Sequence, residues 1–169
     1  MAKAKKFFKR VLLKLSGEML KGKDGFGIDP DATIEAAKRI KEAVDAGVQT
    51  AIIIGAGNIF RGLAGSRQGM DRSCADNMGM LATAMNALAM RDALESIGVK
   101  AEIQSAFAIN GILKPFDQRE AVRLLEEGTV VLFAVLEYAI RCRTYDVVTI
   151  LRGSRSLAAE TRDSGNVTA

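Results

Sequence analysis

The chain has 169 residues, of which 49% are hydrophobic and 26% charged. This is enough apolar material for one globular core, and it excludes disordered, collagen-like and disulfide-rich classes. The formal net charge of +4 comes from interspersed charges, with the visible excess in the first ten residues. We interpret that excess as a solvated tail rather than a contact to phosphate or nucleic acid, so no nucleic-acid partner is expected.

The two cysteines, Cys74 and Cys142, lie far apart in a chain without histidine, so no metal site is expected. We interpret both as free thiols in a reducing cytoplasm. The apolar stretch 11–15 is too short for a signal peptide or a membrane span. We therefore expect a soluble cytoplasmic protein with no membrane partner.

The first predicted elements are a strand, a helix and a second strand. Residues 9–15 form a Val/Leu-rich run that ends in Ser-Gly, which is typical of a buried strand opening into a turn. Asp29 followed by Pro30 predicts a helix start, and Gly47 predicts its end. Residues 50–54 are almost continuously apolar, as in a parallel strand covered on both faces.

A long helix is predicted from Asp71, which could cap it, to Gly98. Methionine at helical spacing is typical of core or helix-interface packing rather than of a ligand surface. We therefore expect one face of this helix to be covered. That face is formed by Met78, Leu81, Met85 and Leu88.

Beyond this helix, residues 99–105 and 129–134 read as strands, and Asp117 with Glu120 resembles a capping box between them. Strands and helices therefore alternate along the chain. This pattern predicts a doubly wound α/β fold with a mostly parallel sheet, whose ligands bind beyond the carboxyl ends of the strands.

The first candidate for chemistry is the turn after the first strand, from Lys14 to Glu18, with Leu15, Ser16 and Gly17 between them. A lysine and the backbone N–H groups of a glycine turn could hold a polyphosphate. An ordinary strand-ending turn is the alternative. The spacing does not match a Walker A loop.

The second candidate is the glycine-bearing segment 55–62, which follows the second predicted strand. Small residues let a ligand approach the backbone, and Arg61 offers a planar, permanently charged group for phosphate. Two such turns on one sheet favour phosphoryl transfer by charge neutralisation, without a protein nucleophile. A purely structural turn remains the alternative.

The third candidate is Asp76, near the start of the long helix, which could accept hydrogen bonds from ribose hydroxyl groups. As a single aspartate it is more typical of a favourable charge at a helix start.

Four blocks together resemble the bacterial uridylate (UMP) kinases of the amino-acid-kinase superfamily. They are residues 11–18, 25–29, 54–62 and 78–83, and their order and spacing match as well. The resemblance covers about residues 8–134.

The resemblance implies a three-layer amino-acid-kinase fold and transfer of the ATP γ-phosphate to UMP, with Mg²⁺ as part of the ATP substrate complex and no tightly bound cofactor. It also implies a cytoplasmic homohexamer that GTP activates and UTP inhibits. Lys14 and Arg61 would be catalytic. ATP would contact Lys14, Leu15, Ser16, Gly17, Gly57 and Arg61.

The resemblance also implies that UMP binds the backbone at Ala56 and the side chain of Asp76. A methyl group at Ala56 departs from the glycine that is usual in the family. The GTP-effector region would comprise Gly22, Lys23, Asp24, Gly25, Phe26 and Gly27. The long helix matches the family's subunit-contact helix.

The resemblance stops near Val135, where the family continues into an Ala-Gly-Thr-Gly-Asn-Pro loop. Codons for Gly-Thr-Gly that lose one G read as Val-Leu-Glu, which is the sequence at 135–137. We therefore predict a frameshift there. Residues 1–134 would be the UMP-binding, N-terminal part of the kinase domain, and 135–169 an aberrant, poorly structured tail. The C-terminal half of the fold would then be missing.

The leading hypothesis is thus a UMP kinase polypeptide with impaired activity. A non-catalytic nucleotide-binding or assembly subunit of a kinase hexamer is the first alternative. The second alternative is an amino-acid-kinase acting on a carboxylate or carbamate, against which the segment 55–62 and Asp76 argue.

Overall fold

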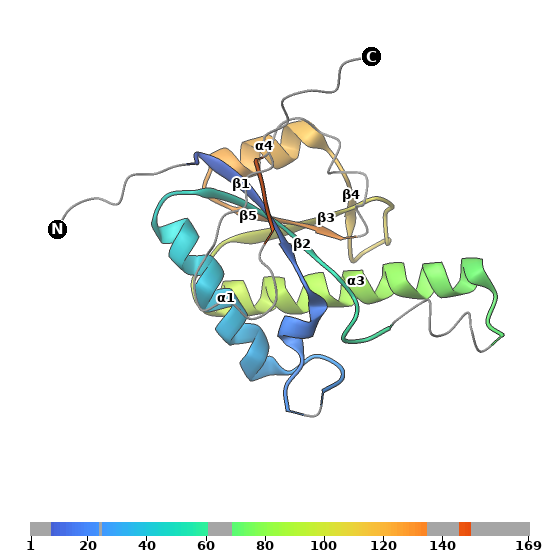
Figure 1. Ribbon diagram of the computed structural model, residues 1–169. Helices are drawn as coiled ribbons and strands as arrows, with labels where there is room; N and C mark the ends of the chain where they lie inside the picture. The colour runs from blue at the N-terminus through green and yellow to red at the C-terminus, as the bar shows by residue number, and fades with distance from the viewer. Residues whose placement is uncertain (1–7, 24, 61–68, 135–145, 150–169) are drawn as a thin grey trace, which may run out of the picture.

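The computed structural model describes residues 8–23, 25–60, 69–134 and 146–149, the last as backbone (Figure 1). In chain order the elements are β1 (Arg10–Leu15), the 3-10 helix η1 (Gly17–Leu20), α1 (Pro30–Asp45), β2 (Gln49–Ile54), α3 (Arg72–Ser96), β3 (Ala101–Ser105), β4 (Lys114–Pro115), α4 (Gln118–Glu126), β5 (Val130–Ala134) and β6 (Asp146–Thr149).

These strands form one sheet in the order β4-β3-β5-β2-β1-β6, and all of its neighbouring strands are parallel. The parallel neighbours β1 and β2 are joined through α1, whereas α3 connects β2 to β3, which lies on the far side of β5. The predicted α/β fold with a mostly parallel sheet is confirmed.

The sheet is the middle layer of three, with α1 and α3 on one face and α4 on the other (Figure 1). Alternation along β1 separates the two cores. Leu13 packs in the larger cluster with residues of α1 and α3, whereas Leu12 packs with Ala121 and Leu125 of α4. The predicted three-layer arrangement is therefore present.

Aspartate caps begin α1, α3 and α4, as predicted. The carboxylates of Asp29, Asp71 and Asp117 accept hydrogen bonds from backbone N–H groups at 2.7, 3.0 and 2.8 Å. The capping box at α4 is only half formed, because Glu120 pairs with Arg123 instead of turning back to the Asp117 N–H. That N–H donates to Gln104 Oε1 at 3.2 Å.

Within the single chain, part of the predicted apolar face of the long helix is not covered. Met78, Leu81 and Met85 are 40%, 50% and 52% exposed, and α3 instead buries a face of small residues. The buried residues are Ala75, Ala82, Ala84, Asn86, Ala87, Met90, Ala93 and Leu94. Alanine lets a helix lie close to its neighbours, so this face packs against the sheet and α1 while the longer side chains stay outside.

One strand, β6, lies within the predicted aberrant tail. It pairs in parallel with β1, with Val147 opposite Leu12 and Thr149 opposite Lys14. The remainder of 135–169 and Cys142 lie outside the described residues. Over the described part of the chain, no helix has the length and apolar character that crossing a membrane requires.

Candidate functional site at the carboxyl edge of the sheet

The two candidate glycine turns meet at the carboxyl ends of β1 and β2. These strands pair in register, with Leu15 opposite Ile54, so both turns leave the sheet at the same level. The Gly55 N–H donates to the Leu15 carbonyl oxygen at 2.9 Å. The structure therefore brings together two segments that the sequence presents about 40 residues apart.

Gly17 is buried where these turns cross. A Cβ atom at this position would overlap the carbonyl oxygen of Gly55 and the side-chain oxygen of Asn58, and would lie 2.9 Å from Asn86 Nδ2. Real Cβ atoms essentially never approach a backbone oxygen so closely. Glycine is thus required here by close packing.

Asn58 and Asn86 form a reciprocal pair beneath the turns. Asn58 Nδ2 donates to Asn86 Oδ1 at 3.0 Å, and Asn86 Nδ2 donates to Asn58 Oδ1 at 2.8 Å. Asn86 also donates to the Gly55 carbonyl oxygen at 2.7 Å, and Asn58 to the Gly27 carbonyl oxygen at 2.9 Å. Asn86 was not among the predicted site residues. Asn86 lies on the face that α3 buries and not on the predicted face of Met78, Leu81 and Met85, so the helical pattern gave no signal for it.

The first turn continues directly into η1. Ser16 begins η1, and its Oγ accepts a hydrogen bond from the Glu18 N–H at 3.3 Å. The Glu18 carboxylate pairs with Lys21 Nζ at 2.5 Å and lies beside Gly57. Lys21 had no predicted role, and its ammonium charge is balanced by Glu18 at the junction of the two turns.

The second turn is held by its own backbone. The Ala56 carbonyl oxygen accepts hydrogen bonds from the N–H groups of Ile59 and Phe60, each at 2.9 Å. Gly57 sits at the turn, where a Cβ would meet only Glu18 Oε1, at 3.6 Å. The turn therefore has a defined shape before any ligand binds.

Lys14 lies in β1 between Ile53 of β2 and Thr149 of β6. It is the exposed residue of that strand, and the alternation of side chains places it on the α4 side of the sheet with Leu12. A lysine one residue before the turn can direct its ammonium group toward a phosphate above the sheet edge. Arg61, its predicted partner, lies outside the described residues.

Asp76 is not brought into contact with the two turns. Its carboxylate is exposed and pairs with Arg72 Nε at 3.4 Å on the outer part of α3. From Asp76 to Asn86 the helix rises about 15 Å at 1.5 Å per residue. The end of the second segment lies nearer to Asp76, because a Cβ at Gly79, three residues further along α3, would be 4.0 Å from Phe60 Cδ1.

The segment 22–27 is attached to the second turn through Gly27. The Gly27 N–H donates to the Asn58 carbonyl oxygen at 2.8 Å, while Asn58 Nδ2 returns a bond to the Gly27 carbonyl. Phe26 is 69% exposed, and Asp24 lies outside the described residues. The predicted effector segment is thus a direct neighbour of the candidate site.

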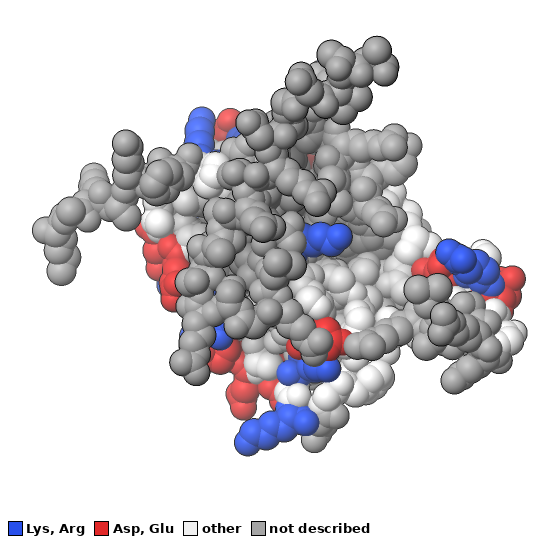
Figure 2. All heavy atoms as spheres, in the orientation of Figure 1, with Lys and Arg blue, Asp and Glu red and all other residues white. Residues whose placement is uncertain are grey.

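On the face shown in Figure 2, charged side chains of both signs gather over α1 and at the outer end of α3. The described surface between them is mostly uncharged, apart from a positively charged group near the centre of the view and a small group of both signs below it. Among the residues that the structure describes, no three carboxylate or thiol side chains are grouped so as to hold a metal ion.

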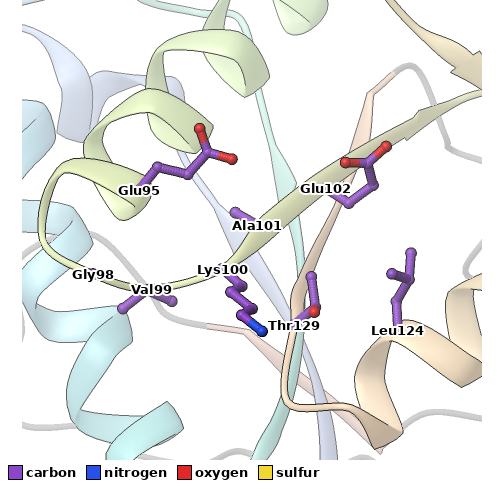
Figure 3. A pocket seen from close by; sticks show the side chains of 8 residues that line it. All are labelled: Glu95, Gly98, Val99, Lys100, Ala101, Glu102, Leu124 and Thr129. Atoms are coloured by element: carbon purple, nitrogen blue, oxygen red, sulfur yellow. The ribbon is translucent and has the colours of Figure 1, made fainter.

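A hollow of about 430 Å³ lies at the edge of the sheet opposite the two turns, at the amino ends of β3 and β5 (Figure 3). It is open and shallow, and it is lined by residues such as Lys100, Glu102, Leu124 and Thr129. Glu102 is already paired with Lys114 at 3.0 Å. This hollow contributes nothing to the two glycine turns.

The glycine turns combine backbone N–H groups, a nearby lysine and a second lysine held by Glu18. Such an arrangement suits an anion with several oxygens, and phosphate is the natural candidate. Among the described residues of the two turns there is no activated nucleophile, so the chemistry that these residues can support is binding and transfer of a phosphoryl group between bound ligands.

Comparison with known proteins agrees with this geometry. The amino acid kinase family model matches residues 9–148, which is most of the chain. The chain belongs to the amino acid kinase family. The match ends within β6, at residue 148, and so extends beyond the predicted end of the resemblance near residue 134.

Two solved bacterial UMP kinases are similar to this chain. The enzyme from Bacillus anthracis is 36% identical with a TM-score of 0.70, and that from Ureaplasma parvum is 32% identical with a TM-score of 0.69. Each match covers 75% of this chain, but only 52% and 55% of the two kinases. The aspartate kinase of Synechocystis, at 16% identity and a TM-score of 0.53, shares the fold alone.

The predicted membership of the amino-acid-kinase superfamily is therefore confirmed, with UMP kinases as structural neighbours. The chain spans about half the length of these neighbours.

Proposed function

We propose that this chain is a UMP kinase polypeptide, which binds UMP and Mg²⁺-ATP and transfers the ATP γ-phosphate to UMP to give UDP for pyrimidine nucleotide biosynthesis. The observation that carries this proposal is the contact between the Gly17 and Gly55 turns at the carboxyl edge of the sheet. It occurs in an amino acid kinase that is 36% identical to a bacterial UMP kinase over the matched part.

In this proposal the protein supplies position and positive charge. A phosphate oxygen of UMP forms a bond to the γ-phosphorus of ATP while the bond to ADP breaks, so the products are UDP and ADP. Lys14 and Arg61 stabilise the charge on the transferring group. The backbone from Leu15 to Gly17, together with Gly57, holds the ATP phosphates.

UMP is proposed to bind the backbone at Ala56 and the side chain of Asp76. Asp76 is exposed and is held only by a surface ion pair with Arg72, so it can turn toward a ribose hydroxyl group at little energetic cost. This part of the proposal predicts that UMP bridges the second turn and the outer half of α3.

We propose that activity is impaired, because the predicted frameshift near Val135 would replace the loop with which the family continues after its last matching strand. The source gene should then show a lost base near codon 135. An uninterrupted reading frame that matches an intact homologous chain would exclude this explanation.

The primary test is ATP-dependent conversion of UMP to UDP by the purified chain, with Lys14→Ala as matched control. Turnover that the control lacks would show a competent site in this chain. A folded chain that binds UMP without turnover would support the impaired form. A folded chain that binds neither UMP nor ATP would contradict the proposal.

A non-catalytic assembly subunit is the second candidate, and the exposed apolar face of α3 favours it. Met78, Leu81 and Met85 stand at helical spacing on the outside of the helix. We propose that this face contacts other copies, up to a homohexamer. Co-purification with an intact UMP kinase, lost when Leu81 is changed to Glu, would support an assembly role.

Regulation by GTP and UTP and a cytoplasmic location also belong to this proposal. The segment 22–27 is the proposed GTP contact, and Phe26 is its most exposed apolar side chain. Phe26→Ala should weaken GTP binding without lowering the melting temperature. Unchanged GTP affinity would remove this segment from the effector site.

A further inference from the structure

We infer that Asn86 is a positioning residue, whose paired side chain holds the two glycine turns of the nucleotide site in their binding geometry. This inference deepens the proposed function and rests on it. Asn86 lies in the middle of α3 and is completely buried. It reaches the site through Asn58 and Gly55.

The hydrogen bonds of the pair are complete. Each side-chain NH₂ group has two protons, and each donates once to the other asparagine and once to a backbone carbonyl oxygen, at 2.7 to 3.0 Å. The alternative amide orientation would point nitrogen at nitrogen. The orientation of both side chains is therefore determined by the network.

The network connects a rigid element to the site. A 25-residue helix carries Asn86, whereas Gly17, Gly55 and Gly27 belong to turns with no long element of their own. Asn86 Nδ2 holds the Gly55 carbonyl and lies against Gly17. A group held by a helix fixes a turn more accurately than the turn's own backbone can.

A buried apolar side chain at position 86 would need no hydrogen-bond partners. A buried carboxamide is favourable only when its donors and acceptors are all paired, and here they pair with the turns rather than with the core. The hydrogen bonds of the pair therefore fix the direction of the groups that they bind. It sets where the carbonyl of Gly55 points, and with it the course of the backbone that would meet phosphate.

The test compares Asn86→Asp with Met90→Ala. Aspartate keeps the shape of asparagine but places an oxygen against the Gly55 carbonyl. Met90 is equally buried one turn further along α3 and is part of the main core. We expect Asn86→Asp to weaken UMP or ATP binding by about tenfold or more, the equivalent of one lost hydrogen bond of about 1.4 kcal/mol.

Met90→Ala should lower the melting temperature. Its nucleotide affinity should stay within about twofold of that of the unaltered chain when the two affinities are measured well below the melting temperature. An equal loss of affinity in both variants, or none in Asn86→Asp, would overturn the inference. Asn58→Ala, Asn86→Ala and the double variant add a further criterion. A double variant no weaker than either single variant shows that the pair acts as one unit, whereas additive losses contradict this.

Amide hydrogen exchange without nucleotide separates this inference from the proposed function. Exchange at the Gly27 and Gly55 N–H groups should accelerate at least about tenfold in Asn86→Asp but not in Met90→Ala. If the chain binds no nucleotide, the proposed function fails, and the exchange rates still decide whether Asn86 holds the turns. Unchanged rates would refute that role.

If Asn86→Asp does not fold, the inference is tested by side-chain hydrogen exchange in the unaltered chain. The side-chain NH₂ protons of Asn58 and Asn86 should exchange far more slowly than those of Asn77, which is exposed on the same helix. Addition of UMP should shift their resonances. Exchange as fast as that of Asn77, or resonances that stay unshifted although UMP binds, would overturn the inference.

Discussion

Gly17 lies against the carbonyl oxygen of Gly55, with no space between them for a side chain. Gly17→Ala should therefore push the two turns apart and destabilise the fold by about 1–3 kcal/mol, as overpacking does. Thermal unfolding measures the loss, and nucleotide binding should fall with it.

Gly55→Ala is the matched control for this prediction. A Cβ at Gly55 would meet the Gly17 nitrogen at 3.7 Å and the Leu15 oxygen at 3.8 Å, which are ordinary contacts. Its melting temperature should stay close to that of the unaltered chain. Equal destabilisation by both substitutions would contradict the close approach at Gly17.

The cap of α1 also supports the loop that precedes it. Asp29 Oδ1 accepts the Ala32 N–H at 2.7 Å, and its carboxylate lies against Gly22. Asp29→Ala should lower stability by about 1 kcal/mol through loss of the cap. Urea denaturation of Asp29→Ala and of Asp31→Ala, an exposed aspartate in the same first turn, tests this. A midpoint shift of equal size in both would mean that charge, not capping, is responsible.

The core on the α4 face depends on two aromatic rings. Phe133 is buried and meets Phe116 edge to face, with ring centroids 5.7 Å apart. Phe133→Ala should destabilise the chain by about 3–5 kcal/mol, enough to unfold a marginal domain. Phe107, which is 37% exposed, is the control, and Phe107→Ala should have a much smaller effect in the same denaturation experiment.

The exposed face of α3 predicts self-association. Leu81→Glu places a charge in the middle of the apolar row of Met78, Leu81 and Met85, so any assembly through this face should dissociate. Analytical ultracentrifugation of this variant beside Ile112→Glu, which alters an equally exposed apolar residue elsewhere, measures the effect. If Leu81→Glu and the unaltered chain sediment alike, α3 is not the contact surface.

Local sequence patterns predicted most of the elements because their signals are short-range. Asp29 and Asp71 cap their helices as expected, and the runs predicted as strands at 9–15 and 50–54 form the strands Arg10–Leu15 and Gln49–Ile54. The two-residue strand Lys114–Pro115 and the strand Asp146–Thr149 were not predicted, because each is defined by its neighbour in the sheet. Neither has a periodic pattern long enough to be identified alone.

The sequence by itself determined the alternation of strands and helices, the two glycine turns and the resemblance to UMP kinases. Only the tertiary structure decided that the turns touch, since contact between Gly17 and Gly55 depends on the pairing of β1 with β2. It also decided which face of α3 is buried, and so turned Asn86 toward the site and Leu81 toward solvent. The helical period shows which residues share a face of the helix, but the shape of the surface against which the helix packs decides which face is buried.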